Sequence, residues 1–388
     1  MNIILITNTL LYALLIYIVY KKNGSWPTLF VLLVYFVFAL NASLIYGTDN
    51  YKWGLYSKRD LSIYPFIYTF VGFLLFALPI LKFKSNTKII MALPKEKEKI
   101  VFYVCLAVML LGGVVNYSFA TSFSDVGEAY GSTVRPTGFA AQIRVVSAAF
   151  LFPTLVMIGY QSTTFGNRKK CFMLLAAYFF NGIIEAMTCG SRGVLFFKVF
   201  HLIIVLLIFK NYWEKKTLRI IFVVMGCVMV FIVSLSLAIS YSRFGDDNAL
   251  SWIFSYFGEP FLNMSLYYWD PTYIWNGMST FGRYFSDSHT INGPYMPILF
   301  KMFSGQSFMD FGLFNGFLFI ILMSFIFTKI MPHKKMLTFG DMLVVMYVYC
   351  HVMRGVFGIM TLGWSAYALI IVLYFYTKDS NGLIARKK

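Results

Sequence analysis

The chain of 388 residues is 59% hydrophobic and 20% aromatic, and its mean hydropathy is +0.71. This composition excludes a soluble globular protein and is typical of a polytopic membrane protein. The net charge of +17 comes mostly from lysines in short connections between apolar runs. The positive-inside rule explains such lysines, so we expect no nucleic-acid partner.

Eleven apolar runs are long enough to cross about 30 Å of hydrocarbon. They predict an all-α fold of about eleven transmembrane helices in a single polytopic membrane domain, residues 1–388. The first run has no basic residue before it and Lys21-Lys22 after it, which predicts an uncleaved span with its N-terminus outside. The runs lie near 3–20, 28–46, 62–81, 100–119, 139–160, 171–188, 194–209, 219–240, 311–329, 342–357 and 359–377.

The connections between these runs alternate in charge. Those expected in the cytoplasm carry 22 of the 33 basic residues, and only three of the 22 are arginines. The alternation predicts an N-out, C-in topology.

Arginine dominates the opposite side. Seven of the eleven basic residues expected outside, or in the outer part of a span, are arginines. Topology needs only positive charge, whereas the rigid guanidinium fork suits bidentate recognition of phosphate or carboxylate. Several such groups could hold a pyrophosphate without a metal and stabilise it as a leaving group; a single one could equally be a snorkelling interfacial charge. The seven are Arg59, Arg135, Arg144, Arg192, Arg243, Arg283 and Arg354.

The longest expected outer connection, residues 241–310, is too aromatic to be disordered. Its segment 250–269 is nearly apolar but is interrupted at Gly258-Glu259-Pro260, since proline removes a helical donor. We expect an interfacial or re-entrant helix there, with its Trp and Tyr side chains at headgroup level. If 250–269 and 294–303 both crossed the membrane, the chain would have thirteen spans.

Ionisable residues inside a span are candidates for function, because they are costly there. Asn181, Glu185 and Arg192 share one helical face if the helix continues through the turn between two spans. Lys198 and His201 follow on the next span. One interpretation is an anion site in which Arg192 binds a phosphate and Glu185 orients it or acts as a base. The alternative is a buried Glu185–Lys198 pair that only holds two helices together.

Two residues of the long loop are candidates for acid–base catalysis. His289 is the only histidine of this loop, and histidine titrates near neutrality. Glu259 is comparable, and Asp287 is a supporting residue. Asp246-Asp247 lacks a third ligand at a useful spacing, so we expect no metal and no cofactor.

Four short segments stand out within residues 120–320. They are Cys189-Gly190-Ser191-Arg192-Gly193, Ser240-Tyr241-Ser242-Arg243, Tyr256-Phe257-Gly258-Glu259 and Asp310-Phe311-Gly312-Leu313-Phe314-Asn315-Gly316. Together with ten or more spans, they resemble the bacterial O-antigen and capsule oligosaccharide repeat-unit polymerases of the Wzy type. The resemblance implies a GT-C-like helical fold. It also implies that undecaprenyl-pyrophosphate-linked oligosaccharides are joined without a nucleotide sugar or a metal. The site of this reaction would be the outer face of the bacterial cytoplasmic membrane, toward the periplasm or exterior.

The resemblance also implies roles for residues. A hydroxyl of the incoming unit would attack the anomeric carbon, assisted by His289 or Glu259. His289-Thr290-Ile291-Asn292-Gly293 is loosely similar to a histidine pattern in the related O-antigen ligases. Arg192 and Arg243 would bind the diphosphate, with further candidates at Arg135, Arg144, Arg283 and Arg354.

Three alternatives remain open. An O-antigen ligase would use the same donor with a different acceptor. A flippase or transporter of the lipid-linked oligosaccharide should place charges at mid-membrane and show related halves. A structural or sensory membrane protein is the third. Expected partners are membrane lipid and a chain-length regulator and flippase of the same pathway.

Overall fold

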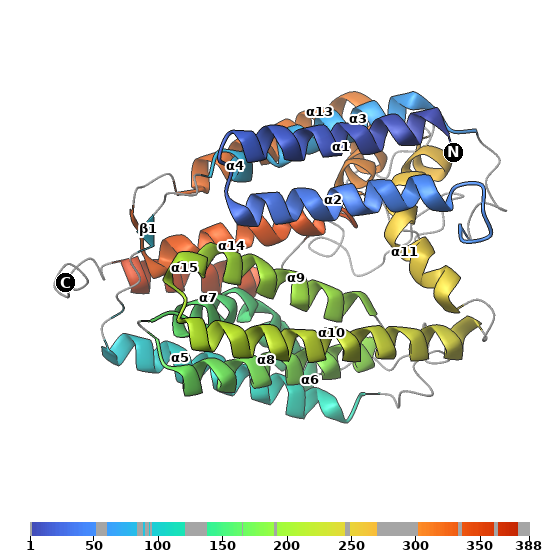
Figure 1. Cartoon of the computed structure of the whole chain (residues 1–388). Coiled ribbons are helices and arrows are strands. Elements are labelled where there is room, and N and C mark those ends of the chain that lie inside the picture. The colour runs from blue at the N-terminus through green and yellow to red at the C-terminus, as the bar shows by residue number, and fades with distance from the viewer. Residues whose placement is uncertain are drawn as a thin grey trace. The chain divides into compact units, whose positions relative to one another are not determined.

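The computed structural model describes the chain in twelve stretches, and it divides the chain into two compact units. The first unit comprises Met1–Ser85, Leu250–Met331 and Val348–Thr361, and the second comprises Asn86–Ala249, Pro332–Tyr347 and Leu362–Lys388. Helices dominate both units (Figure 1). The described stretches are 2–51, 60–83, 88–89, 93, 95–120, 138–164, 166–189, 192–244, 249–269, 302–332, 336–360 and 364–378.

Seven helices of the described residues are long and apolar enough to cross a membrane. An eighth crossing results if α6 (Gly138–Ala149) and α7 (Leu151–Gln161), which are bent by 45°, form one span. These helices are those of a multi-pass membrane protein, as predicted. The seven are α1 (Ile3–Lys21), α2 (Trp26–Ile45), α5 (Lys95–Tyr117), α8 (Arg168–Cys189), α9 (Arg192–Phe209), α10 (Lys215–Phe244) and α13 (Phe303–Ile330).

The expectation of eleven spans is therefore too high. The runs near 62–81, 342–357 and 359–377 form shorter helices. They were counted as spans because hydropathy does not separate a lipid-facing helix from a buried one. The first of them ends at Ala77, and a short helix follows with a proline in its first turn. The second is buried along most of its length. These helices are α3 (Ile63–Phe76) with α4 (Leu78–Leu81), α14 (Phe339–Arg354) and α15 (Trp364–Lys378).

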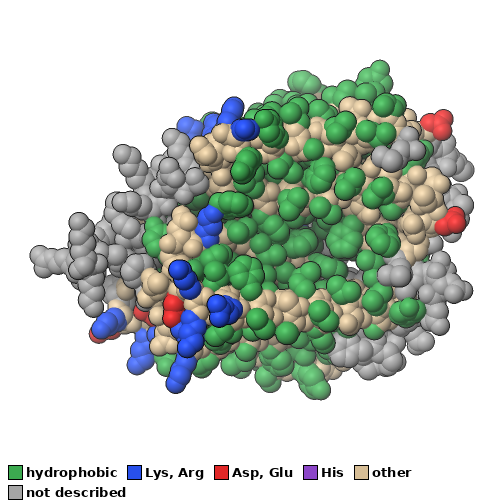
Figure 2. All heavy atoms as spheres, viewed as in Figure 1, with side chains coloured by type: hydrophobic (Ala, Val, Ile, Leu, Met, Phe, Trp, Pro, Cys, Tyr) green, Lys and Arg blue, Asp and Glu red, His purple; other side chains and the backbone are tan. Residues whose placement is uncertain are grey.

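The flanks of the long helices are apolar and exposed. Leu10 of α1 is 62% exposed and Val230 of α10 is 69% exposed. Figure 2 shows hydrophobic side chains along the helices and Lys and Arg side chains gathered toward helix ends. Large apolar surfaces of this kind face water rarely and are expected in contact with lipid.

Aromatic side chains form the core of the first unit. The antiparallel helices α1 and α2 are joined by a hydrogen bond from Thr9 Oγ1 to the Ala39 carbonyl, 3.1 Å. Tyr12 and Tyr35 stack between them with ring centroids 6.1 Å apart. Phe73 of α3 packs on Tyr35 at 4.1 Å, so α3 closes the same core.

Helix α13 folds back on itself at Gly312. This residue has φ 77° and ψ −174°, a conformation that favours glycine. Phe303 and Phe327 both contact the ring of Phe76, with centroids 4.1 and 6.3 Å away. A straight helix would separate the two residues by about 36 Å. The part before Gly312 is therefore a short re-entrant helix that runs opposite to the part after it.

The predicted interruption at Gly258-Glu259-Pro260 is wrong. Helix α11 (Ala249–Asn263) runs through Pro260 and is followed by a π-helical turn, η4 (Met264–Tyr268). Neighbouring helices can compensate for the bond that a proline removes. Gly258 packs against α2, where an added Cβ would lie 2.5 Å from Ile45 Cδ1. Tyr268 is buried in the core. The described part of 250–269 does not qualify as a span.

In the second unit, α5 and α8 run parallel. Near one end, Lys170 Nζ and Gln161 Nε2 donate to Glu98 Oε1 at 2.9 and 2.8 Å. At the other end, Thr188 Oγ1 donates to the Asn116 carbonyl at 3.4 Å. Helices α7 and α9 return in the opposite direction. A parallel pair of two-residue strands, β1 (Lys88–Ile89) and β2 (Met336–Leu337), completes this unit's described elements.

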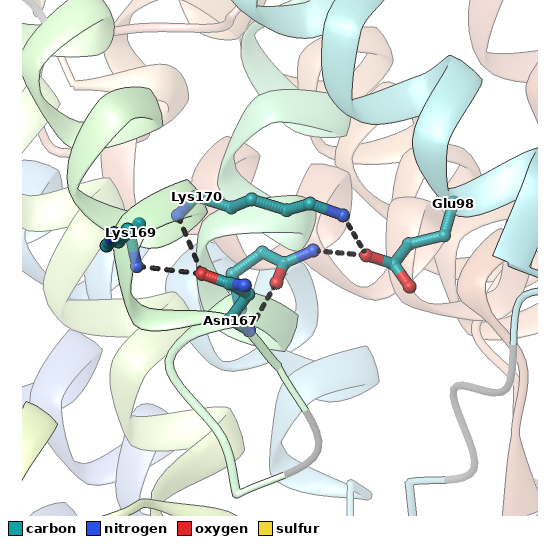
Figure 3. A network of polar contacts seen from close by, with 5 residues as sticks. Glu98, Asn167, Lys169 and Lys170 are labelled. Atoms are coloured by element: carbon teal, nitrogen blue, oxygen red, sulfur yellow. Dashed lines mark hydrogen bonds and ion pairs between the residues drawn. The ribbon is translucent and has the colours of Figure 1, made fainter.

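A polar network ties the basic end of this unit together (Figure 3). Asn167 Oδ1 accepts from the backbone N–H groups of Lys169 and Lys170, and the Asn167 N–H donates to Gln161 Oε1 at 2.7 Å. Arg168 of α8 forms an ion pair with Glu214, which lies just before α10. The connections before α5, α8 and α10, all predicted to be cytoplasmic, thus share one end of this unit's helices. Which membrane face this end meets remains a prediction.

Candidate functional site

A small polar pocket lies between α5, α6 and α8 in the second unit, at the end opposite the basic network. It has room for about one water molecule. Three of its residues come from α8 at spacings of four and three, so they share one helical face. Polar and charged groups are costly inside apolar helices and are therefore candidates for function. The lining residues are Gly112, Asn116, Arg144, Ser147, Asn181, Glu185 and Thr188.

The predicted pairing of Glu185 with Lys198 is confirmed. Lys198, on α9, is only 7% exposed, and its Nζ lies 3.4 Å from Glu185 Oε2. The same Nζ donates to Asn181 Oδ1 at 3.2 Å and lies 4.9 Å from the centre of the Tyr178 ring. A carboxylate, an amide and an aromatic face thus compensate the buried ammonium. Glu185 both joins α8 to α9 and lines the pocket, so the two interpretations of this pair are not exclusive.

Arg144 is a cation of the pocket lining, whereas Lys198 pairs with the lining residue Glu185 from outside it. It is half-buried on α6, and its carbonyl accepts a hydrogen bond from Ser147 Oγ at 2.9 Å. Among the described residues at this site, Arg144 and Lys198 provide two positive charges and Glu185 provides one negative charge. This excess favours an anionic ligand, for which a guanidinium supplies two parallel donors.

Arg192 is the first residue of α9 and does not extend the face of α8, because α8 ends at Cys189. The shared face depended on one helix continuing through the turn, and the described helices α8 and α9 are separate elements. Glycine is a frequent helix terminator, and Gly190 directly follows α8 in the sequence. The first turn of α9 offers unpaired backbone N–H groups and a positive dipole end. The Arg192 side chain lies outside the part of the chain that the structure describes.

The other predicted residues divide between the units. Arg243 lies in the last turn of α10 in the second unit, and its side chain is not described. The first unit holds Arg354, which is exposed at the end of α14, and Glu259, which is buried on α11. Burial raises the pKa of the nearby Tyr51 hydroxyl, and Tyr267 and Glu259 raise it further.

Four predicted residues fall outside the described residues, so their roles remain predictions: Arg135, Arg283, Asp287 and His289. Within the stretches that are described, no three His, Cys, Asp or Glu side chains gather where they could hold a metal ion.

The contribution of α5 was not predicted. Gly112 and Gly113 let this helix approach α6 and α8 closely: an added Cβ would lie 2.5 Å from Asn181 Nδ2 at Gly112 and 2.3 Å from a Phe180 ring atom at Gly113. Asn116, one turn after Gly112, brings an amide into the pocket. The available signal was a Gly-Gly pair followed by an asparagine inside an apolar run.

A larger cavity, of about 310 Å³, lies beside α8, α9 and α10. Its lining is entirely apolar and includes Phe179, Leu195 and Phe231. Among the described residues, this cavity offers no charged group to a ligand.

No known protein family, no curated protein and no solved structure matches this chain. The functional interpretation consequently depends on the pocket and on the sequence.

Proposed function

We propose that this protein is a metal-independent glycosyltransferase of the polysaccharide-polymerase kind, with a lipid-diphosphate-linked oligosaccharide as its donor. The observation that carries the proposal is the meeting of Arg144 with the Glu185–Lys198 pair at one pocket. Cations exceed carboxylates there among the described residues, and the pocket lies opposite the lysine-rich end. A phosphate at an outer membrane surface suits both properties.

In this mechanism the arginines bind and stabilise the leaving group. Arg144 would hold the diphosphate together with Arg192 at the start of α9 and Arg243 at the end of α10. A hydroxyl of the incoming repeat unit attacks the anomeric carbon, and the bond from that carbon to the diphosphate oxygen breaks. A general base must accept the hydroxyl proton, and the sequence offers His289 and Glu259 as candidates for this role. Guanidinium groups fixed before the reaction stabilise the charge that develops on the diphosphate.

Purified protein in detergent tests this proposal directly. It should extend a synthetic polyprenyl-diphosphate oligosaccharide without nucleotide sugar, and chelator should not stop the reaction. A ligase would instead transfer the saccharide only to a different acceptor. Absence of any transfer, combined with movement of the lipid-linked sugar across liposome membranes, would favour the flippase and contradict the proposal.

The proposed orientation has its own test. Lys335 is predicted to face the cytoplasm and Asp247 the outside, from the alternation of charge. In intact cells, an impermeant thiol reagent should label Asp247→Cys and leave Lys335→Cys unlabelled until the membrane is opened. Equal labelling of both variants in intact cells would reverse or invalidate the topology. The native cysteines are removed first so that only the introduced thiol reacts.

A further inference from the structure

Asn116 presents an unused hydrogen-bond acceptor in the pocket. Its side chain is 4% exposed, and its Nδ2 donates to the Gly112 carbonyl at 2.6 Å. This contact determines the orientation of the amide, because a flipped amide would set its oxygen against another carbonyl oxygen. Within the described part of the chain, no donor reaches the buried Oδ1. An amide oxygen in apolar surroundings needs a donor, and a ligand can supply it.

Asn181 presents the complementary group. Its Oδ1 accepts from Lys198 Nζ at 3.2 Å, and an ammonium can only donate, so this amide is also oriented unambiguously. Its Nδ2 therefore faces α5, where an added Cβ on Gly112 would lie 2.5 Å from it. The pocket thus combines an acceptor from Asn116 with a donor from Asn181.

A hydroxyl group matches this pair. It can donate its proton to Asn116 Oδ1 and accept from Asn181 Nδ2 at the same time. The pocket has space for about one water molecule, which suits a single hydroxyl and excludes a whole acetamido group. Arg144 lines the same pocket, so the hydroxyl should belong to a molecule that also carries an anionic group.

We propose that Asn116 and Asn181 bind one hydroxyl of the sugar that is attached to the lipid diphosphate. This inference rests on the proposed function and adds a sugar-recognition site to it. The pocket would distinguish a glycosylated donor from the bare polyprenyl diphosphate, which is the product that must leave after transfer. The asparagines thereby favour substrate over product at a site where the arginines bind both.

The test compares two probes: a polyprenyl diphosphate without sugar, and the same lipid carrying one hexose or N-acetylhexosamine. Asn116→Leu replaces the amide with an apolar group of similar size. It should bind the sugar-free lipid as the wild type does and the glycosylated lipid about tenfold more weakly, as expected for one lost hydrogen bond. Ser162→Ala is the control, because it removes a buried hydroxyl of the same unit that donates to the Gly159 carbonyl at 2.7 Å and does not line the pocket. It should affect neither probe.

A ligand-side experiment covers the case in which Asn116→Leu does not fold. Deoxy-sugar versions of the glycosylated lipid are bound to the wild type, and one of them should lose about tenfold in affinity. Where the variant does fold, it should not discriminate against that analogue, which is the signature of a direct pair.

Several results would overturn the inference. Equal weakening of both probes by Asn116→Leu would place the diphosphate at Asn116. Unchanged binding of both probes, or wild-type affinity for every deoxy analogue, would leave only a water in the pocket. Failure of the wild type to bind even the sugar-free lipid would refute the proposed function itself, and the sugar site with it.

Discussion

Removing the charge of Glu185 should destabilise the second unit, because it leaves a buried cation without its counter-charge. In the variant Glu185→Gln, Lys198 keeps its hydrogen bond to Asn181 and its contact with the Tyr178 ring. Breaking one partner of a buried pair costs about 3–5 kcal/mol. The Glu185 side chain is 32% exposed and screened by that amount of solvent. We therefore expect a loss of about 2–3 kcal/mol.

Removing both charges should restore the stability. An uncharged, well-packed pair of similar volume is often as stable as a buried ion pair. The double variant Glu185→Gln with Lys198→Met should therefore unfold, in detergent, at a temperature close to that of the wild type, while each single variant unfolds earlier. The unfolding midpoint of each purified protein measures this coupling, and the sum of the single effects gives the reference for the double variant.

The double variant also separates the two interpretations of the pair. If Glu185 only joins α8 to α9, the restabilised protein should polymerise normally. If Glu185 also acts in the pocket, as its position there predicts, the restabilised protein should still have lost most of its turnover. A stable and fully active double variant would refute the role of Glu185 in the site. An additive loss of stability in the double variant would refute the energetic coupling instead.

Two further predictions concern arginine and pH. Arg192→Lys and Arg243→Lys should lower polymer yield by about 30- to 1000-fold at matched protein levels. An ammonium does not reproduce the guanidinium fork, and its loss costs about 2–4 kcal/mol of transition-state stabilisation. Wild-type yield would contradict the diphosphate role. The hydrogen bond from Thr217 Oγ1, 2.5 Å, is the main cause that lowers the pKa of Glu214. The stabilisation linked to the lowered pKa of Glu214 is present above the unfolded-state pKa, about 4.3. It is lost as the pH falls through the lower folded-state pKa. The unfolding midpoints of wild type and Glu214→Gln should therefore differ at pH 7 and converge as the pH falls below the folded-state pKa of Glu214; a constant difference would be contrary to this.

Helix existence and the pairing of charges were predictable because each depends on local spacing. Apolar runs of full length form long helices, and Glu185 pairs with Lys198, which lies on the next span of the sequence. The number of crossings was not predictable in the same way. Most of α14 is apolar because it is buried in protein, and hydropathy assigns the same value to that helix as to one in lipid.

Reversal of chain direction was also invisible to hydropathy. The predicted apolar run 311–329 covers only the part of α13 after Gly312, and hydropathy gave no sign that the residues before it form a helix of opposite direction. The proline in α11 caused the opposite error. It predicted an interruption, but Pro260 lies inside a helix that neighbouring contacts maintain. In both cases tertiary packing decided the outcome, and it involves residues that are distant in the sequence.

The polar pocket shows how packing and chemistry depend on the same residue. An added Cβ on Gly112 would lie 2.5 Å from Asn181 Nδ2 and 2.7 Å from Ser147 Cβ. Helices in a membrane gain little from hydrophobic burial against one another, so they associate through close contact at small residues and through polar groups. The contact at Gly112 places amides of α5 and α8 in the lining of one pocket. Because of this contact, the charged pair of α8 and α9 lies beside an unused acceptor on α5, and specificity for a sugar can be built next to a site for phosphate.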